Sequence, residues 1–282
     1  MKKGLILEGG AMRGMFTAGV IDVMMENEIT FDGAIGVSAG AAFGCNYKSG
    51  QIGRVLRYNT KHCRDRRFSG IGSLIKTGNI YNTDFAYGEV PLKYDVFDFE
   101  AYENNPMDFY VVCTDIETGE AVYHNYQGME DHGFDWIRAS ASMPLVSRIV
   151  EIDGRKLLDG GMADSIPVKY FEASGYNRNI VVLTQPENYM KKKNSLMPLI
   201  RIKYKNYPKL IETMENRHLM YNQTLSYISQ REKEGNLFVI RPKEKLQIGK
   251  IEKNPEKLRE IYELGRETVL PRIPEMKKFL QM

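Results

Sequence analysis

Two short apolar runs in the first forty residues are each followed by a glycine turn and then by a helical pattern. Residues 3–8 lead into GGAMRG at 9–14, and residues 31–37 lead into GVSAG at 36–40. After the first turn, apolar side chains recur every three or four positions, which is the spacing of a buried helix face. Strand and helix in alternation predict an α/β fold with a parallel sheet covered on both faces. The glycine turns and the functional groups are then expected at the carboxyl ends of the strands.

The rest of the chain continues this pattern less regularly. Residues 51–105 mix arginines, glycines and tyrosines, and we expect loops with short helices there. Further strands are predicted at 109–114, 121–123, 179–184 and 237–240, and helices at 134–141, 199–233, 255–267 and 271–281. We expect one domain over residues 1–190 and a basic, mainly helical extension over residues 191–282 that packs on it.

Composition places the chain among globular proteins. Of its 282 residues, 43% are hydrophobic and 27% are charged, which argues against a disordered or coiled-coil chain. No apolar stretch approaches the roughly 18 residues that a membrane span needs, and the first apolar run is too short for a signal peptide. We therefore expect a soluble, cytoplasmic protein. The three cysteines, Cys45, Cys63 and Cys113, do not have the spacing of metal ligands. We expect them to be buried thiols and expect no metal site.

The charge is distributed unevenly along the chain. Residues 1–186 carry 18 Lys and Arg against 24 Asp and Glu, whereas residues 187–282 carry 21 against 12. A solvated helical face is the ordinary explanation for the basic segment 191–209, and the alternative is peripheral contact with an anionic membrane. No zinc-finger spacing or RNA-binding aromatic signature accompanies the charge, so no nucleic-acid partner is expected. The sequence does not indicate an oligomeric state.

GVSAG is a GxSxG pattern between a predicted strand and an apolar helix. Gly36 and Gly40 permit the tight turn of a nucleophile elbow, in which Ser38 is held in a strained conformation with its hydroxyl exposed at the sheet edge. The helix behind Ser38 would aim its positive end at developing negative charge. The alternative is a close-packed turn in which Ser38 only caps the helix.

GGAMRG has two interpretations. A degenerate dinucleotide fingerprint would place a pyrophosphate at the helix N-terminus. However, Ala11 stands at the third position of that pattern, Asp32 precedes the second strand instead of ending it, and GVSAG occupies the dinucleotide's place. The second interpretation is an oxyanion hole, in which the backbone N–H groups of residues 9–12 face a tetrahedral intermediate formed at Ser38.

Asp159 ends a short apolar run and precedes Gly160 and Gly161. It can be held rigidly there, and a hydrogen bond to Ser38 would let it act as a general base without a histidine. Taken alone, Asp-Gly-Gly is simply a turn. Only His218 follows Asp159 in the chain, in a charged segment typical of a solvated surface, so no histidine is assigned a catalytic role.

The ordered motifs EGGAMRG at 8–14, GVSAG at 36–40, ASASMP at 139–144 and DGG at 159–161 resemble the patatin-like phospholipase family over roughly residues 1–190. The resemblance implies a three-layer α/β/α core with a mainly parallel sheet, here with a helical C-terminal extension. It also implies that Ser38 is the nucleophile and Asp159 the base of a catalytic dyad. The other positions that it implicates are the oxyanion donors Gly9, Gly10, Ala11 and Met12, and the supporting residues Arg13, Gly14, Gly36, Gly40, Gly160 and Gly161.

The chain departs from the family's pattern at three places. Ala11 stands where glycine is common, Glu8 stands where aspartate is frequent, and MADSIP follows DGG where an asparagine often precedes the xP pair. Ala11 keeps its N–H, so the hole depends on whether the local φ suits a residue with a Cβ. None of the departures removes a reacting group.

The resemblance implies hydrolysis of lipid or carboxylic esters through an acyl-serine, without a metal or other cofactor. Phospholipase A, lysophospholipase and carboxylesterase activities all fit it. A non-catalytic protein of the same fold that binds acyl chains or a partner is one alternative, and a nucleotide-binding protein is another. For the acyl chain we expect a channel made of aromatic residues from 54–94 and apolar residues from the C-terminal part, and ordinary core packing is the alternative explanation for most of them. These residues are Tyr58, Phe68, Tyr81, Phe85, Tyr87, Leu196, Met197, Leu199, Ile200 and Ile202.

Overall fold

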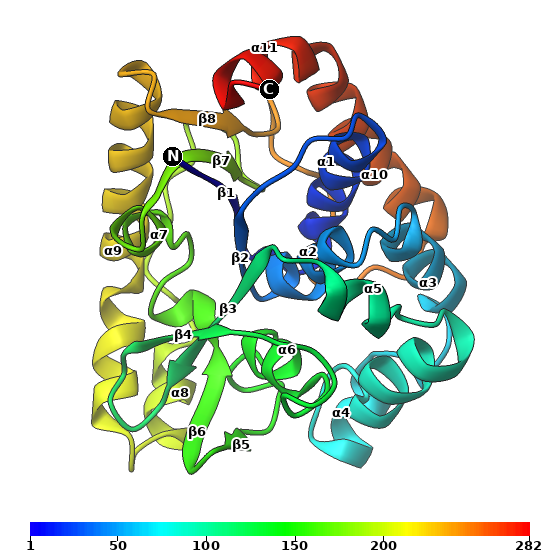
Figure 1. Cartoon of the computed structure of the whole chain (residues 1–282). Coiled ribbons are helices and arrows are strands. Elements are labelled where there is room, and N and C mark those ends of the chain that lie inside the picture. Colours follow the sequence, from blue (N-terminus) through cyan, green and yellow to red (C-terminus); the bar gives the residue numbers. More distant parts are fainter.

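An eight-stranded sheet runs through the middle of the molecule (Figure 1). The computed structural model describes residues 1–282. The strands lie in the order β5-β6-β3-β2-β1-β7-β8, and β4 pairs with β3 outside this path. Their bounds are β1 Lys2–Leu7, β2 Gly33–Val37, β3 Asp108–Asp115, β4 Ala121–Asn125, β5 Val150–Ile152, β6 Arg155–Asp159, β7 Tyr176–Val182 and β8 Leu237–Ile240.

The strands from β3 to β8 along this path are parallel, whereas β4, β5 and β6 pair antiparallel. Leu7 at the end of β1 lies opposite Gly36 of β2 and Val182 of β7, so these three strands end at the same edge of the sheet. The prediction of an α/β fold with a mainly parallel sheet is confirmed.

Side chains of the central strands alternate between two apolar cores. Leu5 and Leu7 of β1 belong to the larger core, and Ile6 between them belongs to the smaller one on the opposite face. The α-helices that contribute to the larger core are α1 Gly14–Glu26, α2 Ala39–Lys48, α3 Arg54–His62, α5 Phe99–Asn104, α6 Asp135–Ser140, α10 Pro255–Val269 and α11 Ile273–Leu280. Those on the smaller core are α7 Val168–Ala173 and α9 Pro208–Lys233.

The C-terminal third shares the sheet and the larger core with the rest of the chain. β8 pairs with β7, and α10 packs against α1 through a glycine on each helix. A Cβ on Gly19 would lie 2.0 Å from the Tyr262 carbonyl oxygen, and one on Gly265 would lie 2.1 Å from the Phe16 carbonyl oxygen. Only glycine permits this approach of two helix backbones. The division of the chain near residue 190 stays a prediction, and the two parts have no separate cores.

Residues 51–105 form short helices joined by loops, as expected. The π-helix η2 contains Pro91, which cannot donate an N–H to the helix. The long helical region predicted at 199–233 is divided into α8 and α9 by residues 204–207, and Pro208 opens the second helix, where proline is favoured. None of the helices combines the length and apolar character that crossing a bilayer requires. The remaining bounds are η1 Ala11–Arg13, α4 Ile71–Thr77, η2 Asp84–Tyr94, η3 Gly160–Met162, α8 Met197–Lys203 and η4 Leu270–Arg272.

Candidate active site

Ser38 occupies a sharp turn between β2 and α2. Its backbone has φ 56° and ψ −120°, a left-handed conformation that is rare for a residue with a side chain. A Cβ on Gly36 would lie 2.5 Å from the Gly40 carbonyl oxygen, and one on Gly40 would lie 2.3 Å from the Leu7 carbonyl oxygen. The turn therefore requires both glycines. Ser38 makes no side-chain cap to α2, so the interpretation of Ser38 as a simple helix cap does not describe this turn.

Asp159 stands at the end of β6, where both of its carboxylate oxygens are held. Oδ2 accepts a hydrogen bond from Ser38 Oγ at 2.7 Å, and Oδ1 accepts one from the Gly161 N–H at 2.8 Å. Pairing of β6 with β3 brings this strand end beside the sheet centre, with Cys113 opposite Asp159. Ser38 is 9% exposed and Asp159 is 7% exposed, so the pair is almost out of reach of bulk water.

The environment of Asp159 changes its basicity. Burial raises the pKa of the Asp159 carboxyl above its usual value of 3.8. The Ser38 hydroxyl, Arg217, the Gly161 N–H and Lys250 act in the opposite direction, because each stabilises the ionised form, but burial outweighs them. A carboxylate with a raised pKa is a better proton acceptor than one in water.

The glycine loop approaches Ser38 and carries free donors. A Cβ on Gly9 would lie 2.8 Å from the Val37 carbonyl oxygen and 3.0 Å from Ser38 Cβ, so only glycine fits there. The N–H groups of residues 9–12 donate to no acceptor in the protein, whereas the Arg13 N–H donates to Gly10 at 3.1 Å. Ala11 has φ 48°, a strained value for a residue with a Cβ. These are the N–H groups that the sequence proposed as oxyanion donors.

Three residues without a role assigned from the sequence, Glu8, Ser140 and Arg217, hold the glycine loop, the serine and the turn at Asp159 in place. Ser140 Oγ accepts the Ser38 N–H at 2.8 Å and donates to the Val112 carbonyl at 2.6 Å. Glu8 accepts hydrogen bonds from the N–H and hydroxyl of Thr184 and from the Tyr221 hydroxyl, which ties the end of β1 to the segment after β7 and to α9. Both Glu8 and Ser140 lie in the motifs on which the family resemblance rests. Membership of these motifs was the only feature of the sequence that pointed to them.

The third residue lies on α9. Arg217 donates from Nε to the Gly161 carbonyl oxygen, in the turn that holds Asp159. Nothing in the local sequence connects Arg217 with Gly161, because they are 56 positions apart and meet only when α9 folds over the sheet.

No histidine is hydrogen-bonded to Ser38 or Asp159. His124 pairs with Asp131 at 2.6 Å and stacks on Trp136, and His132 pairs with Asp153 at 3.1 Å. His62 packs among Phe68, Phe85 and Tyr94. The structure therefore offers Ser38 a carboxylate partner and no imidazole.

An apolar cavity opens beside Ser38. Of its 20 lining residues, 16 are hydrophobic, and they include Met12 of the glycine loop and Phe43 of α2. Of the aromatic residues predicted to form an acyl channel, Tyr58, Phe68, Tyr81 and Tyr87 line this cavity, and Phe85 packs beside them.

The prediction for the C-terminal group of this channel is wrong. Met197 and Ile200 are buried in a separate cluster with Leu158 and Met162, and none of the five C-terminal residues lines the cavity. Leu196, Leu199 and Ile202 are exposed on and next to α8. Helical spacing showed that one face of this segment is apolar, but it could not show which cluster that face covers.

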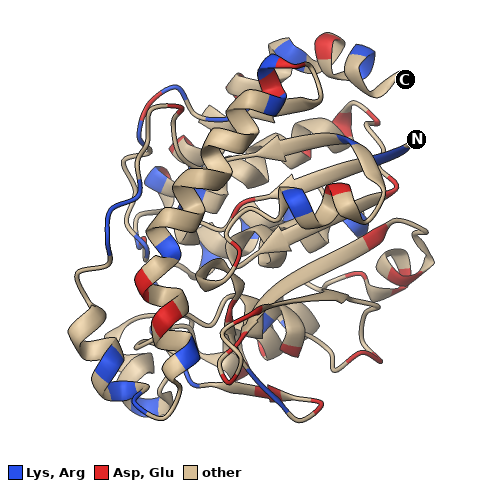
Figure 2. Cartoon of the chain, turned by 90° about the vertical axis from the view of Figure 1, so that its left-hand side faces the viewer, with Lys and Arg blue, Asp and Glu red and all other residues tan.

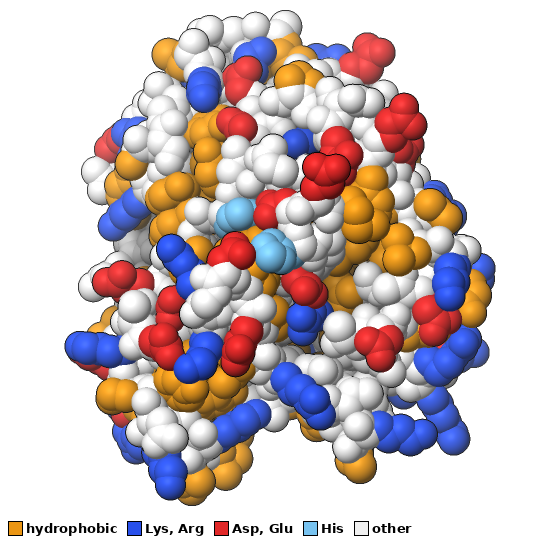
Figure 3. Space-filling model, turned by 60° about the horizontal axis from the view of Figure 1, so that its bottom comes forward, with side chains coloured by type: hydrophobic (Ala, Val, Ile, Leu, Met, Phe, Trp, Pro, Cys, Tyr) orange, Lys and Arg blue, Asp and Glu red, His pale blue; other side chains and the backbone are white.

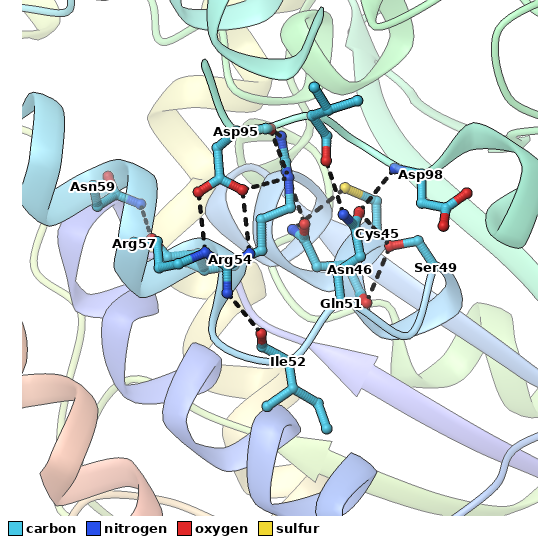
Figure 4. A network of polar contacts seen from close by, with 12 residues as sticks. Cys45, Asn46, Ser49, Gln51, Ile52, Arg54, Arg57, Asn59, Asp95 and Asp98 are labelled. Atoms are coloured by element: carbon cyan, nitrogen blue, oxygen red, sulfur yellow. Dashed lines mark hydrogen bonds and ion pairs between the residues drawn. The ribbon is translucent and has the colours of Figure 1, made fainter. Parts of the chain in front are cut away.

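One wall of the cavity is fixed by Arg54 (Figure 4). From α3, its guanidinium donates to Asn46 Oδ1 at 2.8 Å and to the Asp95 carbonyl oxygen at 3.0 and 2.6 Å. The Asp95 carboxylate in turn accepts two hydrogen bonds of 3.2 Å from Arg57. This network ties the segment after η2 to α2 and α3, so the wall of the cavity is held in place without a ligand.

Comparison with known proteins agrees with this arrangement. The family model described as patatin-like phospholipase matches residues 5–172, and a model described as a domain of unknown function, DUF6363, matches residues 207–281. The chain therefore belongs to the patatin-like phospholipase family.

Individual relatives cover different parts of the chain. The uncharacterized protein YjjU of Escherichia coli is 27% identical over 93% of this chain and 74% of its own length. Lysophospholipase nte1 of Aspergillus niger is 29% identical over 61% of this chain, but this chain spans only 11% of that protein. The crystal structure of VipD from Legionella pneumophila shares the fold over 98% of this chain and 67% of its own, with a TM-score of 0.50 and 14% identity.

Proposed function

We propose that this protein is a serine lipid acyl hydrolase in which Ser38 and Asp159 form a catalytic dyad. The observation that carries the proposal is the 2.7 Å contact between Ser38 Oγ and Asp159 Oδ2, next to four unpartnered N–H groups and an apolar cavity. Membership of the patatin-like phospholipase family supports lipid hydrolysis, and the lysophospholipase among the relatives supports an acyl ester as substrate. A phospholipid, a lysophospholipid or a simple carboxylic ester fits this chemistry.

The first half of the reaction forms an acyl-serine. Ser38 Oγ attacks the ester carbonyl carbon while Asp159 takes the hydroxyl proton. The negative charge that develops on the carbonyl oxygen is stabilised by the N–H groups of residues 9–12, assisted by the positive end of α2. The bond from the carbonyl carbon to the alcohol oxygen then breaks, and Asp159 gives its proton to the departing alcohol.

The second half releases the acid. Water attacks the acyl-serine carbonyl and passes a proton to Asp159, and the same N–H groups stabilise the second oxyanion. Ser38 departs and regains the proton, and the fatty acid leaves. The raised pKa of Asp159 fits a group that accepts and returns a proton in both halves.

A fluorophosphonate probe tests the proposal, because it phosphonylates only an activated serine. We expect the probe to label wild-type protein at Ser38, located by peptide mass, and to leave Ser38→Ala and Asp159→Asn unlabelled. Asp164→Asn is the matched control, since Asp164 is a half-buried aspartate that accepts a hydrogen bond from a hydroxyl, that of Tyr123, at 2.9 Å. Failure to label folded wild-type protein would reject the dyad and favour a non-catalytic protein that binds acyl chains in the cavity.

We further propose peripheral contact with an anionic membrane through the basic segment 191–209. On α8, the exposed side chains Leu199 and Ile202 lie next to Arg201 and Lys203. Lys and Arg positions gather around this helix at the base of the molecule (Figure 2), and hydrophobic side chains stand beside cationic ones there (Figure 3). Apolar insertion combined with cationic attraction is the usual pattern of an interfacial helix.

Vesicle binding tests this contact. We expect binding to anionic vesicles to weaken steeply between about 0.05 and 0.5 M salt, because the Debye length shortens over this range. Ile202→Ser and Lys203→Gln should each weaken binding, and binding that is independent of both salt and these substitutions would reject the contact.

A further inference from the structure

Four cationic side chains gather near the dyad without carboxylate partners. They are Arg13, Lys191, Arg217 and Lys250, and none of them forms an ion pair within the protein. Some other cations of the C-terminal third do have carboxylate partners, since Arg201, Arg231 and Arg241 each pair with a glutamate. Unpaired cations in a cluster are electrostatically unfavourable unless an anion joins them.

Contacts with the site hold three of these side chains in place. Arg217 donates to the Gly161 carbonyl oxygen, and the Gly161 N–H in turn binds Asp159. Arg13 donates to Thr184 Oγ1 at 3.3 Å. Lys191 Nζ lies 4.2 Å from the centre of the Tyr221 ring, while its backbone exchanges two hydrogen bonds, of 2.8 and 3.0 Å, with Asn222.

Contacts on two sides of Glu8 bring Arg13 and Lys191 into one region, because Thr184, which binds Arg13, and Tyr221, over which Lys191 lies, both bind Glu8. The pKa of Lys191 is lowered to about 8, first by burial and then by Arg217, with further contributions from Arg13 and Lys250, while Glu8 opposes them. Arg217 and Lys250 also act on Asp159. Against four cations the region holds the carboxylates of Glu8 and Asp159, which leaves an excess of two positive charges. Glu8 is already engaged by Thr184 and Tyr221.

Lys191 and Arg217 lie on the other side of the sheet from the cavity, whereas the loop that carries Lys250 packs on the larger core through Leu246 and Ile248. None of the four cations lines the cavity, whose residues Met12, Phe43 and Cys45 belong to the larger core. Tyr221, over which Lys191 lies, belongs to the smaller core on the opposite face. An ester bound at Ser38 with its acyl chain in the cavity would therefore have its polar part near the cations.

We propose that Arg13, Lys191, Arg217 and Lys250 bind the phosphate group of the substrate, so that the enzyme prefers acyl esters that carry a phosphate monoester over neutral esters of the same chain. A phosphate monoester carries about 1.5 to 2 negative charges at pH 7, which matches the excess of positive charge. The inference rests on the proposed function, because it assigns the headgroup of that reaction's substrate.

The first arm of the test compares two monomeric substrates, 1-octanoylglycerol 3-phosphate and 1-octanoylglycerol, which release the same acid without a lipid surface. We expect a higher kcat/KM for the phosphate ester in wild-type protein. Lys191→Gln and Lys250→Gln should each reduce the ratio of the two kcat/KM values by about tenfold or more, the usual effect of losing a hydrogen bond to a charged group. Lys245→Gln is the matched control, because Lys245 is exposed in the same loop as Lys250.

The second arm measures binding by calorimetry with the Ser38→Ala variant, with glycerol 3-phosphate and inorganic phosphate as ligands. We expect glycerol 3-phosphate to bind, and Lys191→Gln in that background to abolish the binding. Hydrolysis of both esters with equal kcat/KM, or binding of inorganic phosphate without any preference between the esters, would overturn the headgroup site and leave the proposed function standing. Binding of glycerol 3-phosphate without hydrolysis of either ester would reject the proposed function and keep the anion site.

Discussion

The two sides of Ser38 differ in their chemistry and in the part of the chain that builds them. The cavity side is apolar and is lined by residues between Ala11 and Met143. The other side is cationic, and three of its four charges, on Lys191, Arg217 and Lys250, come from beyond the 5–172 region of the family model. The comparison indicates that the family region contains the groups proposed to react, while the C-terminal third adds charge beside them.

Substitution of Ser38 or Asp159 should reduce hydrolysis equally for all esters, whichever side of Ser38 recognises them. We expect Ser38→Ala and Asp159→Asn to reduce kcat by at least about 10³-fold for every ester, whatever its chain or headgroup. Steady-state fatty acid release, with circular dichroism to verify folding, measures this. A variant that lost activity towards only one class of ester would mean that the two sides do not share one reaction centre.

Filling the cavity should change only the dependence of hydrolysis on acyl chain length. Ala42 lines the cavity, so Ala42→Phe is expected to reduce kcat/KM for long-chain esters by about tenfold to hundredfold while short-chain esters are still hydrolysed. The control is Ala173→Phe, at an exposed position at the end of α7. An unchanged chain-length profile would show that acyl chains bind elsewhere.

The attachment of the C-terminal third to the core can be tested at the contact between α1 and α10. A Cβ on Gly265 cannot fit beside the Phe16 carbonyl, so Gly265→Ala should lower the free energy of unfolding by about 1–3 kcal/mol. Gly72→Ala is the control, because a Cβ there meets nothing within 4 Å. Urea unfolding measures both variants, and equal stability would mean that α10 can shift without cost.

Burial of Asp159 predicts the effect of pH on both activity and stability. Its folded pKa is raised above 3.8, and only the ionised carboxylate can accept the Ser38 proton, so kcat/KM should fall as the pH drops through this raised pKa.

The same raised pKa affects stability, because the folded protein holds the Asp159 proton more tightly than the unfolded chain does. Wild-type protein should therefore lose stability relative to Asp159→Asn as the pH rises from 3.8 to the folded pKa, and keep that deficit above it. A pH–rate profile and melting temperatures of both proteins measure the two effects, and a difference in melting temperature that does not change with pH would contradict the raised pKa.

The smallest effect is expected at Ala11. Its φ of 48° strains a residue with a Cβ, so Ala11→Gly should change the free energy of unfolding by no more than about 1 kcal/mol and should keep hydrolysis. Thermal unfolding and ester hydrolysis measure this. A large loss of activity would show that the Ala11 methyl group itself orients the substrate.

Local signals predicted the parts of the site that short segments build. Gly36 and Gly40 predicted the tight turn at Ser38. A Cβ at either position would lie 2.3–2.5 Å from a backbone carbonyl oxygen, so no other residue type fits there. Asp159 stood out at the end of an apolar run before two glycines, and the family resemblance supplied its expected role. The alternation of strands and helices predicted that the central strands are parallel. The prediction for Leu199 and Ile202 failed, because periodicity identifies an apolar face without identifying its neighbour.

The sequence by itself determined the alternation of strands and helices, the two glycine turns and the residue types proposed for the chemistry, because each depends on backbone conformation or side-chain spacing within a few positions. Only the tertiary structure decided that Ser38 and Asp159 lie 2.7 Å apart and that Arg217 reaches Gly161. It alone also decided that Arg13, Arg217 and Lys250 lie close enough to Lys191 to lower its pKa. These contacts join residues brought together by the order of the strands and by the packing of α9 on the sheet, and no local pattern records that order.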